Sequence, residues 1–280
     1  NNFELDNNIN AAATANWNNG AGFSPIGNKN IKYTGKFDGH GFAIDSLYIN
    51  RPDSNYIALF GATYGSEIAN IGIRNSDFTG NNYVAGLVGK NYSTSINLCH
   101  SAVNITAEDY AGGLVGYNDT LSIVSMCYSI GNISGSWAIG GLIGRNSDYT
   151  NTFNSYSKCN VSGKSLVGGL VGMNYSTSIN YCYSTGSVSG PKSEKVGGLI
   201  GQHPIEPVIS CFWDVQTSGT TSSESGKGKN TSEMKTKSTF TEAGWNFNFV
   251  WAIDPTINDG YPYIYDRGLV ISSGLEPIDT

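Results

Sequence analysis

Charged residues are scarce in this 280-residue chain: only 14% of its positions are Asp, Glu, Lys or Arg. The formal net charge is −6, so the sequence lacks the basic surface that nucleic acids and anionic membranes attract. No apolar run approaches the roughly 18–20 residues that span a bilayer. The composition therefore predicts no nucleic-acid partner and no membrane-spanning segment within this sequence.

Histidine is scarce too, with His40, His100 and His203 only. None has metal-ligand spacing and no His-Glu-x-x-His helix occurs, so we expect no metal site, no cofactor, and histidines that are structural or exposed. The opening NNFELDNNIN shows no signal-peptide pattern, and we expect it to be a mature or trimmed start.

Glycine is abundant, with 36 residues, and it marks an internal repeat. A block such as GGLVG recurs every 27–29 residues, with its Gly-apolar-apolar-Gly part starting at Gly86, Gly113, Gly141, Gly169 and Gly198, and more loosely at 58–61. A second landmark keeps the same period: Cys99, Cys127, Ser155, Cys182 and Cys211. A third is Ile105, Ile133, Val161 and Val188. Agreement among three landmarks establishes the repeat.

The repeat unit has the character of strands. Its apolar runs are short and are cut by Gly, Asn and Ser, without the i, i+3, i+4 pattern of a helix. Three strands of about five residues and three turns fit one coil, whereas a propeller blade needs about 40–50 residues. The sequence predicts an all-β, right-handed parallel β-helix of about 28-residue three-strand coils, stacked about 4.8 Å apart.

Stacking predicts ladders of equivalent residues. Block glycines would permit positive φ and close backbone approach at corners. Leu87 and Val88 each begin an apolar ladder, and the pattern does not decide which of the two faces inward. Asn91, Asn118, Asn146 and Asn174 would form a ladder at a turn.

The cysteines suggest a small buried slot. Cys99, Cys127, Cys182 and Cys211 would line this ladder; spacing permits disulfides, but parallel side chains favour free packed thiols. Cys159 falls outside the ladder, and we expect an exposed thiol or an intermolecular crosslink.

The block, the period and the flanking segments resemble the GLUG repeat family. The resemblance is strong over 86–201 and looser at 58–61, and 33–49, 211–247 and 260–265 resemble the segments that flank such repeats. It implies a secreted or surface-displayed protein, often adhesin-like, in bacteria or archaea.

We expect one continuous domain: N-terminal coils over 1–57, the repeat solenoid over 58–217, and a loop with an aromatic cap over 218–280. Within the loop, Asn230 and Glu233 predict a capping box for a short helix. The aromatic residues near the C-terminus predict a hydrophobic plug over the last coil; the alternative is a sugar-stacking platform that includes Trp245, Trp251 and Tyr261.

No catalytic pair of carboxylates stands out. Asp119 and Asp148 are out of register by one residue in a turn without a basic cluster, and Asp109 and Glu194 are three coils apart. N-glycosylation sequons follow the repeat and would decorate two corners of the solenoid; they lie at Asn91, Asn104, Asn118, Asn132, Asn160, Asn174 and Asn230.

These patterns favour a non-enzymatic extracellular protein: a rigid solenoid displayed at the cell surface for adhesion, or a subunit of a surface filament. The alternative is a carbohydrate-active or carbohydrate-binding β-helix. Expected partners are a host or neighbouring-cell surface, glycans, or other copies of the chain stacked end to end.

Overall fold

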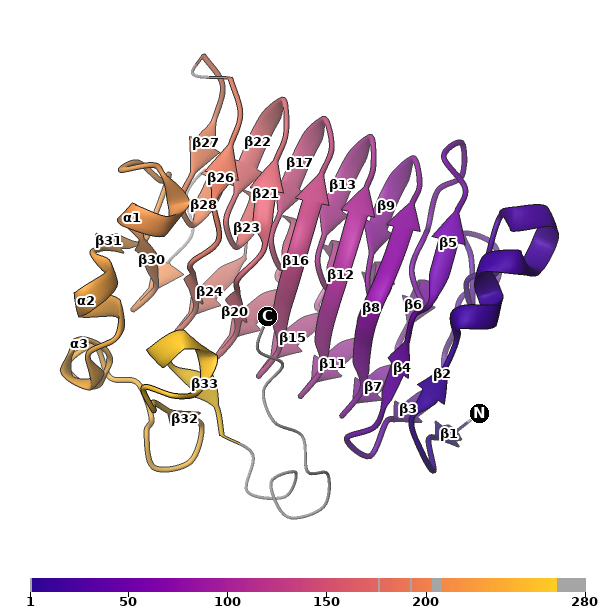
Figure 1. The fold of residues 1–280 in the computed structure, drawn as a ribbon, viewed down its shortest axis with the longest axis horizontal. Coiled ribbons are helices and arrows are strands. Elements are labelled where there is room, and N and C mark those ends of the chain that lie inside the picture. Colours follow the sequence, from indigo (N-terminus) through magenta and orange to yellow (C-terminus); the bar gives the residue numbers. More distant parts are fainter. Residues whose placement is uncertain (1, 176, 192, 203–207, 266–280) are drawn as a thin grey trace.

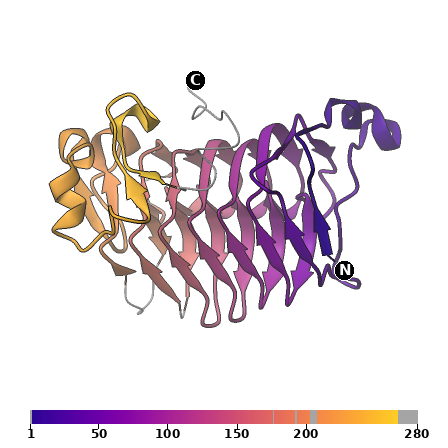
Figure 2. The same cartoon turned by 90° about the horizontal axis from the view of Figure 1, so that it is seen from below.

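The chain winds into a stack of coils along one axis (Figures 1 and 2). The computed structural model describes residues 2–175, 177–191, 193–202 and 208–265. Every strand ladder of the stack is parallel, and equivalent residues of successive coils pair, as Val88 does with Val115 and Ser95 with Ile123. The predicted all-β solenoid of about 28-residue coils is confirmed.

The strands form four sheets that run along the stack. Sheet A contains β1 (Asn2–Glu4), β3 (Lys36–Asp38), β7 (Glu67–Ala69), β11 (Ser95–Asn97), β15 (Ile123–Ser125), β19 (Asn151–Phe153), β24 (Ser178–Asn180) and β29 (Val208–Ile209). Sheet B contains β2 (Ile9–Asn10), β4 (Ala43–Asp45), β5 (Tyr48–Asn50), β8 (Gly72–Thr79), β12 (His100–Thr106), β16 (Tyr128–Ser134), β20 (Tyr156–Ser157), β21 (Asn160–Ser162), β25 (Tyr183–Ser184), β26 (Val188–Ser189), β30 (Phe212–Asp214) and β31 (Lys227–Lys229). Sheet C contains β6 (Phe60–Tyr64), β10 (Val88–Tyr92), β14 (Val115–Asp119), β18 (Ile143–Asn146), β23 (Val171–Asn174) and β28 (Ile200–Gln202). Sheet D contains β9 (Asn82–Ala85), β13 (Asp109–Gly112), β17 (Trp137–Gly140), β22 (Ser165–Gly168) and β27 (Val196–Gly197).

A repeat coil carries four strands, one more than the sequence predicts. One coil, for example, consists of β9, β10, β11 and β12. The extra strand arises at the glycine block, where β13 ends at Gly112 and β14 begins at Val115. The block therefore contains a sharp turn between a sheet D strand and a sheet C strand.

The last glycine of each block lets sheets C and D touch through their backbones. A Cβ atom on Gly144 would lie 2.6 Å from the carbonyl oxygen of Gly116 and 2.8 Å from backbone atoms of Tyr110 and Ala111. Such distances are too short for real Cβ contacts, which essentially never fall under 3.0 Å. Gly144 itself does not have positive φ. The close approach of neighbouring backbone atoms, rather than a left-handed conformation, explains why glycine occupies position 144.

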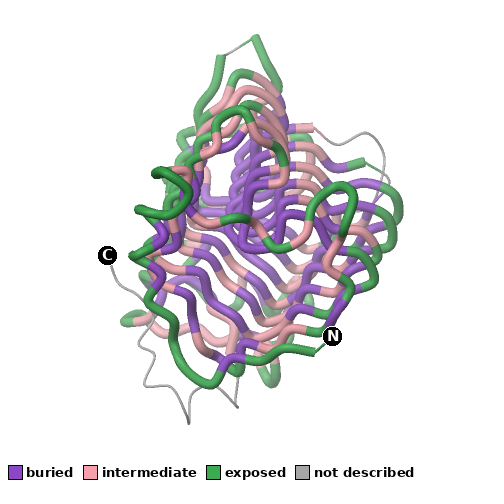
Figure 3. The backbone as a smooth tube through the Cα atoms, turned by 90° about the vertical axis from the view of Figure 1, so that its right-hand side faces the viewer, coloured by how far each residue is buried: buried purple, intermediate pink, exposed green. Residues whose placement is uncertain are grey.

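Both apolar residues of each block are buried, which answers the question that the sequence leaves open. Leu87 and Val88 are fully buried, as are their equivalents in the next coils: Leu114, Val115, Leu142, Ile143, Leu170, Val171, Leu199 and Ile200. Figure 3 shows buried positions repeating in rows along the stack. These rows form one continuous hydrophobic core.

The C-terminal end of the stack is covered by the chain that follows β30. Strand β31 pairs in parallel with β30, and the short helix α1 (Val215–Ser218) lies between them in sequence. The Gly198 N–H donates to the Ser222 carbonyl, and the Glu224 N–H donates to the Ile200 carbonyl. This segment thus occupies strand edges that would otherwise be open to another chain. The loop expected at the start of 218–280 is wrong in part, because this stretch contains β31 and backbone pairing at an edge needs no apolar side chains.

The rest of the C-terminal segment folds against the side of sheet B (Figure 2). It contains α2 (Thr231–Met234), α3 (Lys237–Thr241), β32 (Trp251–Ala252), η2 (Asn258–Gly260) and β33 (Tyr263–Ile264). Helix α2 begins with the predicted capping box: the Glu233 N–H donates to Asn230 Oδ1, and the Asn230 N–H donates to Glu233 Oε2, both at 2.9 Å. That prediction is confirmed.

The N-terminal end has a lighter cover. Strands β1 and β2 lie at the edges of sheets A and B, and the 3-10 helix η1 (Ala12–Gly20) follows them. Thr14 is buried there, and its hydroxyl oxygen accepts a hydrogen bond from the Tyr48 N–H at 3.0 Å. An apolar cavity of about 310 Å³ lies beside η1.

Candidate functional site

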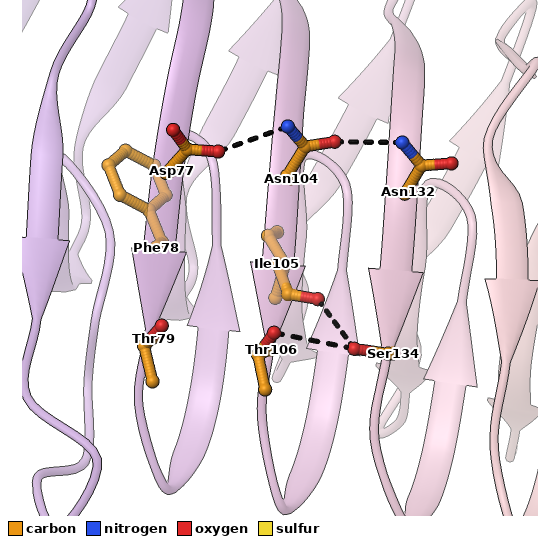
Figure 4. Close-up of a pocket in the computed structure, with 8 residues that line it drawn as sticks. All are labelled: Asp77, Phe78, Thr79, Asn104, Ile105, Thr106, Asn132 and Ser134. Atoms are coloured by element: carbon orange, nitrogen blue, oxygen red, sulfur yellow. Dashed lines mark hydrogen bonds between the residues drawn. The ribbon is translucent and has the colours of Figure 1, made fainter.

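A groove of about 390 Å³ crosses the outer face of sheet B, where β8, β12 and β16 run side by side (Figure 4). Side chains alternate along these strands, so Val103 and Ile105 enter the core while Asn104 and Thr106 are exposed. We call this surface the amide groove. Its lining residues are Asp77, Phe78, Thr79, Asn104, Ile105, Thr106, Asn132 and Ser134.

Side-chain amides form an exposed ladder across the amide groove. Asn104 Nδ2 donates to Asp77 Oδ1 at 3.0 Å, and Asn132 Nδ2 donates to Asn104 Oδ1 at 2.9 Å (Figure 4). Beyond the groove, Asn160 Nδ2 donates to Asn132 Oδ1 at 3.1 Å, and the Ser187 hydroxyl donates to Asn160 Oδ1 at 2.9 Å. Each amide is therefore fixed in orientation by its neighbours.

The ladder leaves hydrogen-bonding capacity facing solvent. An Asn amide carries two N–H donors, and the ladder uses one donor each on Asn104 and Asn132. Hydroxyl groups of Thr79, Thr106 and Ser134 lie two residues further along the same strands. The pattern repeats about every 4.8 Å along the stack. Such a surface suits an extended polar ligand with a regular repeat.

The groove offers little acid–base chemistry. Asp77 is the one carboxylate among its lining residues. Hydrolysis of a glycosidic bond ordinarily uses two carboxyl groups flanking that bond. In the part of the chain that the structure describes, no group of three or more His, Cys, Asp or Glu side chains is placed to hold a metal ion.

Comparison with known proteins identifies the repeat. The model of the GLUG motif matches residues 108–134 and 163–189, which are two of the coils described above. The chain contains GLUG repeats. The resemblance seen in the sequence is confirmed at the level of the motif.

Two curated proteins are similar to parts of this chain. A protein of Evansella cellulosilytica described as a Gly-rich membrane protein is 33% identical over 94 residues, which cover 32% of this chain and 10% of that protein. Halomucin of Haloquadratum walsbyi is 36% identical over 131 residues, which cover 45% of this chain and 1% of halomucin. No solved structure matches the chain. Among the described residues, no helix has the length and apolar character needed to cross a membrane.

The sequons of the GLUG coils divide into exposed and buried sets. Asn104, Asn132 and Asn160 are exposed on sheet B and remain candidate glycosylation sites. Asn91, Asn118 and Asn174 are fully buried, so their amides cannot meet a glycosyl transferase in the folded protein. Asn230 is exposed and engaged in the capping box, after the last coil. The predicted decoration of two corners is therefore corrected to one face.

The buried asparagines form a second ladder inside sheet C. Asn91 Nδ2 donates to Asn118 Oδ1 at 2.8 Å, Asn118 Nδ2 to Asn146 Oδ1 at 2.9 Å, and Asn146 Nδ2 to Asn174 Oδ1 at 3.1 Å. This continuous chain satisfies polar groups that would be costly to bury alone. It belongs to the interior and is not a ligand site.

The cysteine ladder lies in the core, where the sequence predicts a small buried slot. Cys99, Cys127, Cys182 and Cys211 are buried and free, with Ser155 in the middle of the ladder. The Cys99 N–H contacts Cys127 Sγ at 3.4 Å, and the Cys127 N–H donates to Ser155 Oγ at 3.1 Å. Burial raises the pKa of the Cys127 and Cys182 thiols, which keeps them unreactive.

Cys159 corrects an expectation. The sequence suggested an exposed or crosslinking thiol, but Cys159 is fully buried and free. Burial raises the pKa of its thiol to about 11, and its backbone N–H donates to Ser157 Oγ. It packs in the core like the other cysteines.

The proposed sugar-stacking residues lie in a hydrophobic cluster. Trp245, Trp251 and Tyr261 are 4%, 1% and 4% exposed, so their ring faces are covered by protein. They pack against Tyr156 and Tyr183 of sheet B rather than over the end of the last coil. The plug interpretation fits this arrangement, but its position moves to the side of the stack.

We expect Trp251→Ala to destabilise the protein by about 3–5 kcal/mol, because it empties a fully buried site. Phe249→Ala is the control, since Phe249 is 70% exposed two residues earlier and its loss should cost less than about 1 kcal/mol. Denaturant unfolding of both variants checks the difference. Equal stability of the two variants would contradict the plug.

A column of stacked rings extends from beneath this cluster. His100, Tyr128, Tyr156 and Tyr183 stack with centroids 4.9 Å apart at each step and planes within 5° of parallel. His100 also covers Gly72 of the preceding coil. Burial, assisted by the Arg74 charge, lowers the pKa of His100 to about 3, so the imidazole is neutral at pH 7. His100 therefore has a structural role, as expected; His203 lies outside the described residues.

His100 predicts acid sensitivity. Its pKa is about 3 in the fold and about 6.5 when unfolded, so the unfolded state binds more protons between these values. Stability should fall as pH drops from 7 to 4, by about 3 kcal/mol, and this loss should level off below pH 3. Thermal unfolding of wild type and His100→Phe across this range tests the contribution. If the stability of His100→Phe falls with pH as steeply as that of wild type, His100 is not the source of the acid sensitivity.

The acidic pair lies closer together than the sequence suggests. Burial raises the pKa of Asp148, and the neighbouring Asp119 carboxyl raises it further. Lys90 lies 3.1 Å from Asp119, and Arg145 is near enough to act on Asp148, so the expectation of no basic cluster is wrong.

Sequence reasoning missed the groove as a surface, although part of its signal was present. Asn104 and Asn132 were singled out as sequons, and Asp77 lies one period before Asn104. Aligning positions by period would have placed the three side chains in one row. That a concave surface forms there depends on the path of the coils, which the period does not encode.

Proposed function

We propose that this chain is a rigid, non-enzymatic module of an extracellular or cell-surface protein, with an adhesive role. The observation that carries the proposal is the unbroken register of the coils along β10, β14, β18 and β23 of sheet C, reinforced by the buried asparagine ladder. A stack of this kind keeps its shape without a ligand and exposes long lateral faces. The names of the two relatives, a membrane protein and a halomucin, support a surface setting.

Surface labelling tests the setting. Antibodies raised against the purified chain should label intact cells of the source organism, and protease treatment of those cells should remove the label. Labelling that appears only after permeabilisation would contradict the proposal.

The amide groove supports glycan binding as the adhesive contact. Its oriented amides and hydroxyls match the repeated hydroxyl groups of a polysaccharide, and weak contacts along a rod add up through multivalency. Sugar contact through Trp245, Trp251 and Tyr261 is not part of this proposal, since their rings are buried.

Binding to a polysaccharide panel tests the groove. The double variant Asn104→Ala with Asn132→Ala should weaken binding by on the order of tenfold or more while remaining folded, because both residues are exposed. Asn151→Ala, which changes an exposed asparagine on sheet A, is the matched control and should bind normally. A double variant that binds like wild type would remove the groove from the proposal.

Copies stacking end to end, the filament form of this function, receive less support. The segment after β30 occupies strand edges at the C-terminal end, through the Gly198–Ser222 and Ile200–Glu224 hydrogen bonds. Continuous growth needs two open ends. Filament formation would require this segment to move away.

A further inference from the structure

A row of long side chains follows the outer face of sheet C. Lys90, Tyr117 and Arg145 occupy equivalent positions on β10, β14 and β18. Tyr83 and Tyr110 of sheet D stack beside the row: ring centroids lie 5.1 Å apart for Tyr83 and Tyr110, and 5.6 Å apart for Tyr110 and Tyr117. We call Tyr83, Tyr110 and Tyr117 the tyrosine strip. It has a cation on either side of Tyr117.

The first of these cations, Lys90, is fully satisfied inside the protein. Its Nζ lies 4.1 Å from the Tyr117 ring centroid and 3.1 Å from Asp119 Oδ2. The side chains of Lys90 and Asp119 are only 12% and 9% exposed, respectively. Burial alone would lower the pKa of Lys90, but hydrogen bonds to Tyr92 and Asp119 outweigh it and raise the pKa. Lys90 is a structural cation with a fixed counterion.

The second cation, Arg145, has no such partner. Its guanidinium lies 5.0 Å from the Tyr117 ring and 5.9 Å from the Tyr110 ring. Within the part of the chain that the structure describes, it makes neither a hydrogen bond nor an ion pair, and its Nε is buried without an acceptor. The terminal nitrogens are not buried in this way, so they can donate to a ligand. A guanidinium held on aromatic rings with unused donors is suited to a planar oxyanion.

Two exposed aromatic residues follow the sheet C strand of Arg145 and the neighbouring strand. Tyr149, four residues after Arg145, is 75% exposed. Tyr175 is 46% exposed and directly follows Asn174, which pairs with Asn146 in the neighbouring coil. Both rings therefore come from the turns that follow β18 and β23. Large flat apolar rings beside polar donors are typical of sites that hold a ring-shaped polar ligand.

We propose that Arg145 binds the carboxylate of a uronic-acid polysaccharide, with Tyr149 and Tyr175 against its sugar rings. This rests on the proposed extracellular role and extends it to a second contact surface with a defined ligand class. Carboxylate is favoured because its two coplanar oxygens match the guanidinium fork. The net charge of −6 opposes unspecific attraction of polyanions, so recognition must come from this local site.

Asp148 limits the strength of this site. Its carboxyl lies close enough to Arg145 for the two charges to interact, and it competes with a ligand for the guanidinium. Removing that charge should therefore strengthen carboxylate binding. A purely structural Arg145 would show no such gain, which makes Asp148→Asn a direct test of the site.

The experiment measures binding of the intact 280-residue chain to polygalacturonate by titration calorimetry. Three other polymers are measured for comparison. Neutral dextran tests binding of sugar without charge, dextran sulfate tests binding of a sulfated sugar, and polyglutamate tests binding of carboxylates without sugar. Arg145→Gln should weaken polygalacturonate binding by on the order of tenfold, Arg145→Lys by less, and Asp148→Asn should tighten it. The exposed Lys29→Gln is the charge-matched control and should leave affinity unchanged.

Each outcome decides the assignment. Selective polygalacturonate binding that follows this order supports it, provided thermal melts show the variants folded; Arg145→Lys keeps the test valid if Arg145→Gln unfolds. Equal binding of dextran sulfate overturns the preference for carboxylate, and equal binding of polyglutamate overturns the role of the sugar. No polygalacturonate binding, or binding unaffected by Arg145→Gln, overturns the site. None of these outcomes alters cell-surface labelling, so failure here is distinct from failure of the proposed function.

Discussion

Asn118→Leu is expected to destabilise the protein by about 2–5 kcal/mol. Asn118 is fully buried in the middle of the internal asparagine ladder. Its loss leaves Asn91 Nδ2 without an acceptor and Asn146 Oδ1 without the Asn118 donor, both in the interior. Each buried polar group left without a partner costs about 1–3 kcal/mol. Leucine is similar in size, so the loss reports mainly on hydrogen bonding.

The chain provides a matched control in Asn132→Leu. Asn132 also links two neighbouring amides at the same spacing, but it is exposed, so water can replace the lost bonds. We expect a change of less than about 1 kcal/mol. Urea denaturation followed by circular dichroism compares the two variants. If both lose the same stability, the buried ladder has no special role.

Gly144→Ala should be still more damaging, with a loss of about 3 kcal/mol or more, or failure to fold. The added Cβ meets backbone atoms of Gly116, Tyr110 and Ala111 at 2.6–2.8 Å. Backbone held in two ladders cannot move aside as a side-chain tip can, and overpacking commonly costs about 1–3 kcal/mol even where side chains can yield. The coil that contains Gly144 and the preceding coil would have to separate.

Gly219→Ala separates this effect from the general cost of replacing glycine. Gly219 follows α1 with φ of +72°, and nothing lies within 4 Å of its added Cβ. We expect a loss of about 1 kcal/mol, from backbone strain alone. Soluble yield and the denaturation midpoint compare the two variants. Gly144→Ala with wild-type stability would contradict the backbone contact between sheets C and D.

The period alone was enough to predict the solenoid, because residues that repeat every 27–29 positions must fall on equivalent sites of stacked coils. It also placed Ser155 among the cysteines, since the slot is defined by position and size rather than by residue type. The capping box was readable because its two residues act locally, within one turn of helix. These features depend on spacing or on adjacent residues.

The fourth strand of each coil could not be predicted from the spacing of the repeat, because it involves a backbone conformation that the residue types do not reveal. Four sheet D strands, β9, β13, β17 and β22, each contain a left-handed residue; these are Tyr83, Tyr110, Ala138 and Leu166, with φ from 55° to 61°. Such values ordinarily favour glycine or asparagine. Here the surrounding ladders impose the conformation on large and small residues alike, so no residue pattern marks it.

Strand alternation in the sequence distinguishes the exposed asparagine ladder from the buried one. Asn104 is flanked by Val103 and Ile105, so strand alternation sends it outward. Asn91 is flanked by Lys90 and Tyr92, and the same rule sends it inward. The sequon pattern treats both as surface sites and misses this difference. Arg145 was harder to predict, because Tyr175 occupies the position one coil further on that Asp119 occupies relative to Lys90.

The covered C-terminal end has a consequence for how such a protein changes in evolution. Because the terminal segment fits the last coil, while interior coils fit one another, a duplicated stretch of about 28 residues is accommodated most easily in the middle. Each duplication lengthens the molecule by about 4.8 Å and leaves both tips as they were. The length of the stack can thus be adjusted by unequal recombination, one increment at a time, without redesigning any packing surface.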